Sequence, residues 1–277
     1  MKHYLKTTSL PAFSIGLLLM PAAYAEEIGQ PILPEQQSIE QKQPDFNKTE
    51  FLLGIAAGYA DSGYHDKSAD WTAAPLIQLE TKRFYIRGLS AGVKLYTSAN
   101  QSQELLLGAT YLRDYGLKPS DSNNVHLQQL NRRKNGVMAD ISYNLYTPYG
   151  NLETQVSHDI SGTNKGITAQ AQYSYFWSPK PQLLIKPIIG IAYYNRRFNQ
   201  YYYGISIDES LRNGLAAYRP RASVNPYVGL ETQYNLTPKL SGFVGILIEA
   251  LPPTVKNSPM NDGKYRIQDT VGMMYHF

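Results

Sequence analysis

Few residues in this chain could carry out catalysis, and their spacing argues against it. Ser157, His158 and Asp159 are consecutive and have the residue types of a hydrolase's nucleophile, base and orienting acid. They lie in a segment with alternating residue character, and neighbouring side chains in a strand point to opposite faces. Ser157 and His158 therefore cannot form a nucleophile–base pair, and we predict that the protein is not an enzyme. A triad of Ser157 with a distant histidine stays open, although no sequence feature supports it.

The spacing of the metal-ligating residue types indicates no metal site. The chain has no cysteine and five histidines. No histidine has a second histidine two or four residues away, as a local metal site would need. We expect neither a metal nor another cofactor. The histidines are His3, His65, His126, His158 and His276.

The segments around these residues alternate with period two, which predicts β-strands. GITAQAQYSYFW at 166–177 and VMADISYNLY at 137–146 each place apolar residues on one face and polar residues on the other. Nine further segments follow the same pattern, at 51–60, 72–81, 83–98, 101–113, 149–160, 181–194, 222–235, 238–250 and 266–277. Tight turns join several of them, at 147–150, 178–181 and 236–239. The pattern predicts a meander of long antiparallel strands.

Such a meander fits a soluble sandwich or lipocalin-like barrel, or a transmembrane barrel. Strand length, polar faces rich in amides and carboxylates, and tyrosines near strand ends favour the second. We predict an all-β fold, a transmembrane antiparallel up-and-down β-barrel. Eleven segments are visible, and single-chain bacterial barrels have an even number of strands. We expect about 12 strands, with 10 as the alternative, and a hidden strand where 83–98 breaks at Gly88.

The first 25 residues have the pattern of a secretory signal peptide. Lys2 and Lys6 precede a short apolar stretch, and Ala23 and Ala25 form an A-x-A cleavage site. Removing residues 1–25 lowers the formal net charge from +4 to +2 because it removes two lysines and no acid. This weak charge argues against a nucleic-acid partner.

The remaining chain divides into a tail and the predicted barrel. Residues 26–50 are rich in Glu, Gln and Pro, which predicts a disordered acidic periplasmic tail. It could be a spacer or a docking segment. Residues 51–277 are predicted to form the outer-membrane barrel, and the long connections 113–135 and 195–220 are expected to be extracellular.

The strand at 266–277 is expected to close the barrel. Its alternate residues Val271, Met273, Tyr275 and Phe277 form the lipid-facing row. An apolar row with a terminal aromatic resembles the signal that the outer-membrane barrel assembly machinery reads. Closure leaves no open edge in lipid, so this strand is predicted to pair with the first strand, near 51–60.

Charged residues on the inward rows have two interpretations. They could form a salt-bridge network across a narrow lumen, or they could line a small polar conduction path. These residues are Lys94, Glu104, Asp140, Glu153, Asp159, Lys186, Glu231 and Arg266.

The connection at 113–135 carries a second group of charged residues, all basic. They could bind lipopolysaccharide phosphates, or they could be solvated loop charges. The group consists of Arg113, Lys118, Arg132, Arg133 and Lys134.

The loop at 195–220 resembles the signature of the MipA/OmpV family of outer-membrane proteins, named after the MltA-interacting protein. Agreement extends to 84–96, 131–139 and the hairpin around LTPKLSGFVG. The motif residues are Tyr202, Tyr203, Gly204, Ser206, Glu209, Ser210, Gly214, Tyr218 and Pro220. Ser206 and Glu209 also form a capping box, and Gly214 suits a helix C-terminus, so one short helix is expected at 207–213.

The resemblance implies a function in cell-wall remodelling. It implies a non-enzymatic scaffold in the outer membrane that links a lytic murein transglycosylase to a murein synthase. The alternative is a narrow channel or permeability protein for small solutes or antibiotics. Only the periplasmic tail and the short turns could contact periplasmic partners.

Overall fold

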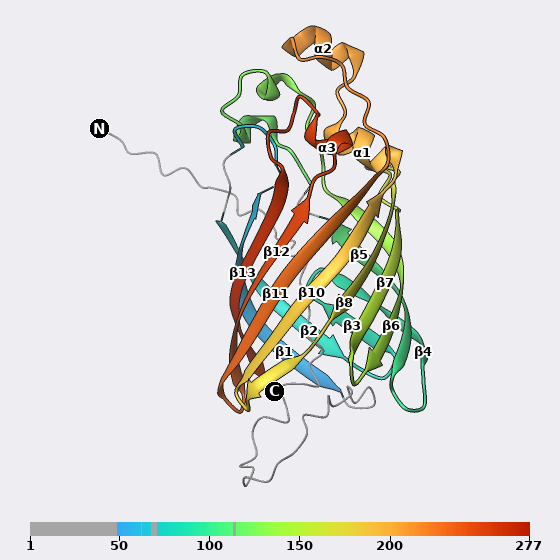
Figure 1. Cartoon of the computed structure of the whole chain (residues 1–277), viewed down its shortest axis with the longest axis vertical. Coiled ribbons are helices and arrows are strands. Elements are labelled where there is room, and N and C mark those ends of the chain that lie inside the picture. The colour runs from blue at the N-terminus through green and yellow to red at the C-terminus, as the bar shows by residue number, and fades with distance from the viewer. Residues whose placement is uncertain (1–48, 62, 68–70, 113–114) are drawn as a thin grey trace, which may run out of the picture.

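The computed structural model describes residues 49–277, except for 62, 68–70 and 113–114. The expected signal peptide at 1–25 and nearly all of the expected tail at 26–50 lie outside the described residues. Figure 1 shows the described chain as a barrel of tilted strands with its helices gathered at one end.

The strands match the alternating segments of the sequence. Their bounds are β1 Glu50–Asp61, β2 Trp71–Glu80, β3 Phe84–Arg87, β4 Ser90–Thr97, β5 Gln103–Leu112, β6 Gly136–Thr147, β7 Gly150–Asp159, β8 Ile167–Ser174, β9 Trp177–Lys180, β10 Leu183–Tyr194, β11 Ser223–Thr237, β12 Leu240–Ala250 and β13 Tyr265–His276. The helices are α1 Arg196–Tyr203, α2 Ile207–Asn213 and α3 Pro253–Lys256, with 3-10 turns η3 Pro119–Asp121 and η4 Leu127–Gln129.

The sheet closes on itself, since β13 pairs antiparallel with β1 and β10 pairs with both β8 and β11. Twelve strands form the ring, and the short β9 is an extra strand that pairs with the start of β10. The prediction of about 12 strands is confirmed, and the alternative of 10 is wrong.

The hidden strand lies where the sequence predicted it. Residues 83–98 form a short hairpin of β3 and β4, and Gly88 at its tip has a φ of 58°. Glycine adopts this left-handed conformation without the steric cost that a Cβ would bring. The break at Gly88 is confirmed.

The hairpin covers only the lower part of β2. Among the described residues, Gln78–Glu80 of β2 pair with β3, and the N-H of Gly88 donates to the carbonyl of Ile77. The backbone groups of Ile77 thus point toward the side of β3. Residues two apart in a strand direct their backbone groups to the same side, so those of Pro75 point to the same edge of β2, beyond the end of the hairpin. Proline has no N-H to leave unpaired, which suits it to such an edge.

The apolar rows face outward. The exposed fractions of Val271, Met273 and Tyr275 are 47%, 43% and 41%, whereas Met274 between them is 8% exposed. A soluble barrel would place this row inside, so the outward row confirms the transmembrane orientation of the faces. Within the described part of the chain, no helix is both long and apolar enough to cross a membrane.

The predicted seam between the first and last segments is confirmed. Leu52 of β1 is opposite His276 of β13, and the ladder continues to Asp61 opposite Ile267. The N-H of Phe277 donates to the carbonyl of Phe51 over 3.2 Å, and the two rings lie 5.1 Å apart. The aromatic pair lies beside the start of β1.

The two ends of the barrel differ. Connections of two residues join β6 to β7 and β11 to β12 at one end, which we call the turn end. The long connections 115–135, 195–222 and 251–264 lie at the other end, which we call the loop end (Figure 1). Outer-membrane barrels have short periplasmic turns and long extracellular loops, which predicts that the loop end is the extracellular one.

Candidate functional site: the barrel lumen and its cover

Four charged side chains form a compact network inside the wall made by β2–β5. The ammonium of Lys94 lies 2.9 Å from a carboxylate oxygen of Glu80 and 3.4 Å from one of Glu104. Arg87 pairs with Glu80 as well. The side chains of Lys94 and Glu104 are 1% and 0% exposed. Buried charges of this kind are tolerated only when they are paired.

Two further ion pairs lie on the opposite part of the wall. Lys186 and Glu231 are directly opposite each other on β10 and β11, with 3.5 Å between Nζ and a carboxylate oxygen. Arg266 pairs with Glu249 in the same way across β12 and β13.

One interpretation of the sequence had charges meeting across the lumen, whereas each ion pair within the described part of the barrel joins strands of one wall. Side chains opposite each other in a ladder have Cβ atoms about 5 Å apart. Residues on facing walls of the barrel are farther from each other. The strand register therefore decides which charges meet.

The register also aligns one inward residue from each of eight strands in a single row. In strand order these are Glu104, Asn144, Glu153, Gln172, Gly190, Tyr227, Glu249 and Arg266. Gln172 donates to Glu153 over 3.0 Å and accepts from the hydroxyl of Tyr227 over 3.1 Å. A Cβ on Gly190 would lie 2.3 Å from the Tyr227 ring, so only glycine leaves room for that ring.

A cavity of about 330 Å³ remains inside the barrel beside this row. Asp140, Ser142, Gln155 and Ser157 line it from β6 and β7. Asp140 accepts from the hydroxyl of Thr110 over 2.8 Å, and no cation of the described chain lies within 4 Å of its carboxylate. The cavity can hold water or a small polar solute.

The candidate hydrolase residues separate as the alternation predicted. Ser157 is buried inside the barrel and His158 is exposed on the outside. The carboxylate of Asp159 accepts from the backbone N-H groups of Ser161, Asn164 and Lys165 over 2.9, 2.7 and 2.7 Å. Asp159 therefore orders the connection between β7 and β8 and does not orient a base.

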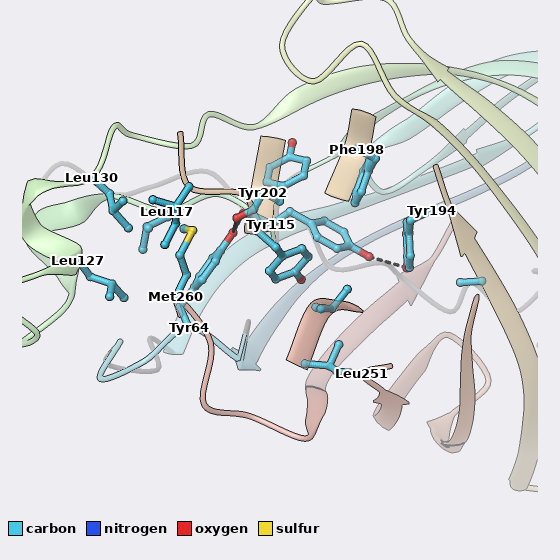
Figure 2. Packing of buried hydrophobic residues seen from close by; sticks show 14 of the residues in the cluster. Tyr64, Tyr115, Leu117, Leu127, Leu130, Tyr194, Phe198, Tyr202, Leu251 and Met260 are labelled. Atoms are coloured by element: carbon cyan, nitrogen blue, oxygen red, sulfur yellow. Dashed lines mark hydrogen bonds between the residues drawn. The ribbon is translucent and has the colours of Figure 1, made fainter. Parts of the chain in front are cut away.

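The main hydrophobic core lies beneath the loops and not inside the barrel wall. Figure 2 shows Tyr64, Tyr115, Phe198 and Tyr202 packed against each other between loops that are distant in sequence. Phe198 and Tyr202 are 0% exposed. The hydroxyls of Tyr115 and Tyr194 lie 2.7 Å apart, which links this core to the top of β10. The loop end of the lumen is thus covered by an apolar cluster.

The family-signature residues build this cover. Tyr202 and Tyr203 end α1 inside the core, and Gly204 packs against Gln200 so closely that a Cβ would lie 2.1 Å from its amide nitrogen. The hydroxyl of Tyr218 donates to the carbonyl of Thr254 over 3.1 Å, which ties this loop to the one before β13. Pro220 is also buried.

The predicted helix at 207–213 is α2. Ser206 caps it in a complete capping box with Glu209, and Gly214 ends it with a φ of 75°. The hydroxyl of Ser210 donates to the carbonyl of Leu215 over 2.6 Å. The sequence predicted one helix in the connection 195–220 and therefore missed α1, and it gave no signal for α3, which has only four residues.

An ion pair fastens α2 to the loop between β5 and β6. Arg133 donates from both terminal nitrogens to the Glu209 carboxylate, over 2.9 and 3.2 Å, and to the carbonyl of Gly204 over 2.9 Å. Both residues are buried. We call this pair the latch. Arg133 is therefore buried and paired within the protein, which departs from both interpretations of it, as a ligand for lipopolysaccharide phosphates and as a solvated loop charge. Of the other basic residues in that group, Lys118, Arg132 and Lys134 are exposed, and Arg113 lies outside the described residues.

The latch is expected to weaken only in strong acid. Burial by itself would raise the pKa of Glu209, but its hydrogen bonds to Arg133 and to the Ser206 backbone outweigh burial and lower the pKa to about 2. A depressed carboxyl pKa contributes stability that is complete above the usual value and is lost as the pH falls toward the folded value. Hydrogen exchange in 204–221, corrected for intrinsic rates, should stay slow at pH 5 and accelerate between pH 4 and 2. Glu209→Gln should remove this dependence, and an unchanged profile in that variant would contradict the assignment.

One cluster of metal-ligating side chains was missed by the sequence. His65, Asp66 and Asp262 bring one ligand atom each within 4.8 Å at the loop end. His65 Nδ1 lies 2.8 Å from Asp66 and 3.7 Å from Asp262. Two separate loops supply these residues, so no spacing in the chain could reveal them. The two acids are exposed, and a pairing of His65 with them accounts for the geometry without an ion.

Comparison with known proteins identifies relatives over nearly the whole described chain. The family model described as MltA-interacting protein MipA matches residues 53–277. The MltA-interacting protein of Escherichia coli (strain K12) is 31% identical over 227 residues, which cover 82% of this chain and 90% of that protein. The putative outer membrane protein YiaT of the same organism is 29% identical over 230 residues, covering 83% and 92%.

Solved structures show only a general likeness. An outer-membrane channel from Pseudomonas putida F1 has a TM-score of 0.43 at 9% identity and covers 86% of this chain and all of that one. The NanC porin has a TM-score of 0.41 at 8% identity, covering 80% and 98%. At these TM-scores the likeness carries no functional information. The closed barrel and the relatives together place the protein in the outer membrane.

Proposed function

Because the chain belongs to the family of MltA-interacting proteins MipA, we propose that it is an outer-membrane scaffold for cell-wall remodelling. It would hold a lytic murein transglycosylase at its periplasmic side and bring a murein synthase to the same place. The observation that carries this proposal is the match over 53–277 together with a relative that is named for its interaction with MltA.

The architecture supports a scaffold better than an open pore. The apolar cluster covers the loop end, and buried ion pairs occupy parts of the lumen. The partner surface would then be the turn end. Tyr149, between β6 and β7, is 83% exposed there, and exposed tyrosines are frequent anchors in protein interfaces.

Binding to an immobilised lytic transglycosylase of the MltA type tests the proposal. The detergent-solubilised protein is compared with an unrelated outer-membrane barrel and with empty micelles. We expect the immobilised transglycosylase to retain this protein but not the unrelated barrel or the empty micelles. We expect a murein synthase to be retained only when the transglycosylase and this protein are both present. Two variants distinguish binding through the turns from binding through the tail: Tyr149→Ala alters a turn, and a second variant lacks residues 26–48 of the tail. The scaffold proposal fails if the intact protein is not retained above the unrelated barrel.

A second candidate is a permeability function, which the polar cavity of about 330 Å³ favours. Its lining amides and carboxylates could hold a small polar solute inside the barrel. The cover would have to open for solutes to pass, so this function depends on the latch.

A further inference from the structure

Four exposed basic side chains share one groove at the extracellular end of the barrel. Arg196 and Arg197 begin α1, Lys165 lies between β7 and β8, and Arg219 precedes β11. All four line a depression of about 960 Å³ between α1, the start of α2 and the connection from β7 to β8. We call it the basic groove, defined by Lys165, Arg196, Arg197 and Arg219.

The charge of the basic groove is not balanced by the protein. Arg133 and Glu209 also line it, but the latch pairs them with each other. The remaining acid is Asp208, which leaves an excess of three positive charges. In the part of the chain that the structure describes, no carboxylate lies within 4 Å of any of the four basic side chains. Their charge is therefore available to a ligand.

The N-terminus of α1 carries positive charge, whereas a helix N-terminus favours negative charge. Asn195 caps it by accepting from the N-H of Phe198 over 3.0 Å, and its first turn contains two arginines and no acid. The helix dipole makes this end positive and disfavours cations there. Sequences that oppose a local preference in this way often do so at functional sites. An anion bound in the groove would remove the repulsion.

The surface directly below the groove faces lipid. Ile160 directly follows β7, Ile167 begins β8, and Tyr193 is the second-last residue of β10; they are 60%, 42% and 40% exposed. Figure 1 places α1 just above the ends of these strands. The groove therefore lies where the apolar wall meets the extracellular headgroup layer. A ligand that fits both surfaces has phosphates above and acyl chains below.

We propose that the basic groove binds the phosphate groups of lipopolysaccharide in the outer leaflet, with its acyl chains lying along β7, β8 and β10. Arginine suits phosphate because its guanidinium can donate two parallel hydrogen bonds. The site differs from the 113–135 loop that the sequence suggested. It is independent of the proposed scaffold function, which concerns the periplasmic side.

The test compares a charge reversal in the groove with a matched reversal in the loop. Arg196→Glu/Arg197→Glu places acids in the first turn of α1, where the dipole favours them, so the helix should remain folded. Lys118→Glu/Arg132→Glu makes the same change of charge at exposed residues of the 113–135 connection. Binding of diphosphorylated, monophosphorylated and dephosphorylated lipid A to the detergent-solubilised full chain is measured by native mass spectrometry. Glucosamine 1-phosphate and inorganic phosphate serve as free-anion probes.

We expect the groove variant to bind diphosphorylated lipid A at least about tenfold more weakly, since charge-assisted hydrogen bonds are lost. The loop variant should change less than about twofold if its charges are solvated. Affinity should fall with each phosphate removed, and the free anions should bind far more weakly than the lipid. Equal weakening in both variants, equal binding of dephosphorylated lipid A, or free anions that bind as tightly as the lipid would overturn the proposal.

Discussion

Replacing Arg266 with methionine should lower the free energy of unfolding by about 3 to 5 kcal/mol, the usual cost of removing one member of a buried ion pair. Arg266 is 5% exposed, stacks 4.1 Å above the Tyr115 ring and pairs with Glu249, which is 2% exposed. The substitution would leave the Glu249 carboxylate buried without its cation. Asn225 and Tyr194 still donate to that carboxylate, which limits the loss without supplying a charge.

Urea unfolding in short-chain lipid vesicles, followed by tryptophan fluorescence, measures this loss. Arg212→Met is the matched control, because Arg212 is an exposed residue of α2, and it should change stability by less than about 0.5 kcal/mol. The double variant Arg266→Met/Glu249→Leu should recover much of the lost stability, because it removes both charges. If Arg266→Met were as stable as the Arg212→Met control, the result would mean that water in the lumen solvates Glu249.

Replacing Arg133 with alanine should release α2 from the loop between β5 and β6. Glu209 would then be buried without its cation, and the energy of local opening should fall by about 3 kcal/mol. If opening is fast relative to cleavage, trypsin should cut after Arg212 about 100-fold faster. Lys118→Ala, a change at an exposed residue of the same connection, should leave the rate unchanged. Equal cleavage of both variants would show that the apolar cluster alone holds the cover.

The same variants decide between the scaffold and the permeability function. We expect no conductance steps from the wild-type protein in planar bilayers, since the apolar cluster covers the loop end. Steps in Arg133→Ala alone would show that the latch closes a conducting lumen. Absence of steps in both proteins would contradict the permeability function and would leave binding to the transglycosylase unaffected.

Much of the barrel was predictable because its signals are local. Alternation of residues placed Val271 and Met273 outside and Met274 inside without knowledge of any neighbour. The broken segment at Gly88 followed from the required even number of strands. The capping box placed α2 because Ser206 and Glu209 are three residues apart in the chain.

The contacts of the charged residues were less predictable, because they depend on pairing between distant segments. Arg133 looked like one of several basic loop residues, but it lies 76 residues from its partner Glu209. The basic groove draws its residues from two connections, 160–166 and 195–222, so its charge is not visible as a cluster in the chain. Lys186 and Glu231 also meet only because β10 and β11 pair in one register.

The sequence by itself determined which face of each strand meets lipid, where the turns lie and how the barrel closes. These features follow from period-two alternation and from short turn and capping patterns, which act between residues close in the chain. The tertiary structure decided which charges neutralise each other, that aromatic loops cover the lumen, and which basic side chains remain for a ligand. Those outcomes depend on strand register and loop packing, which bring together residues that the chain keeps far apart.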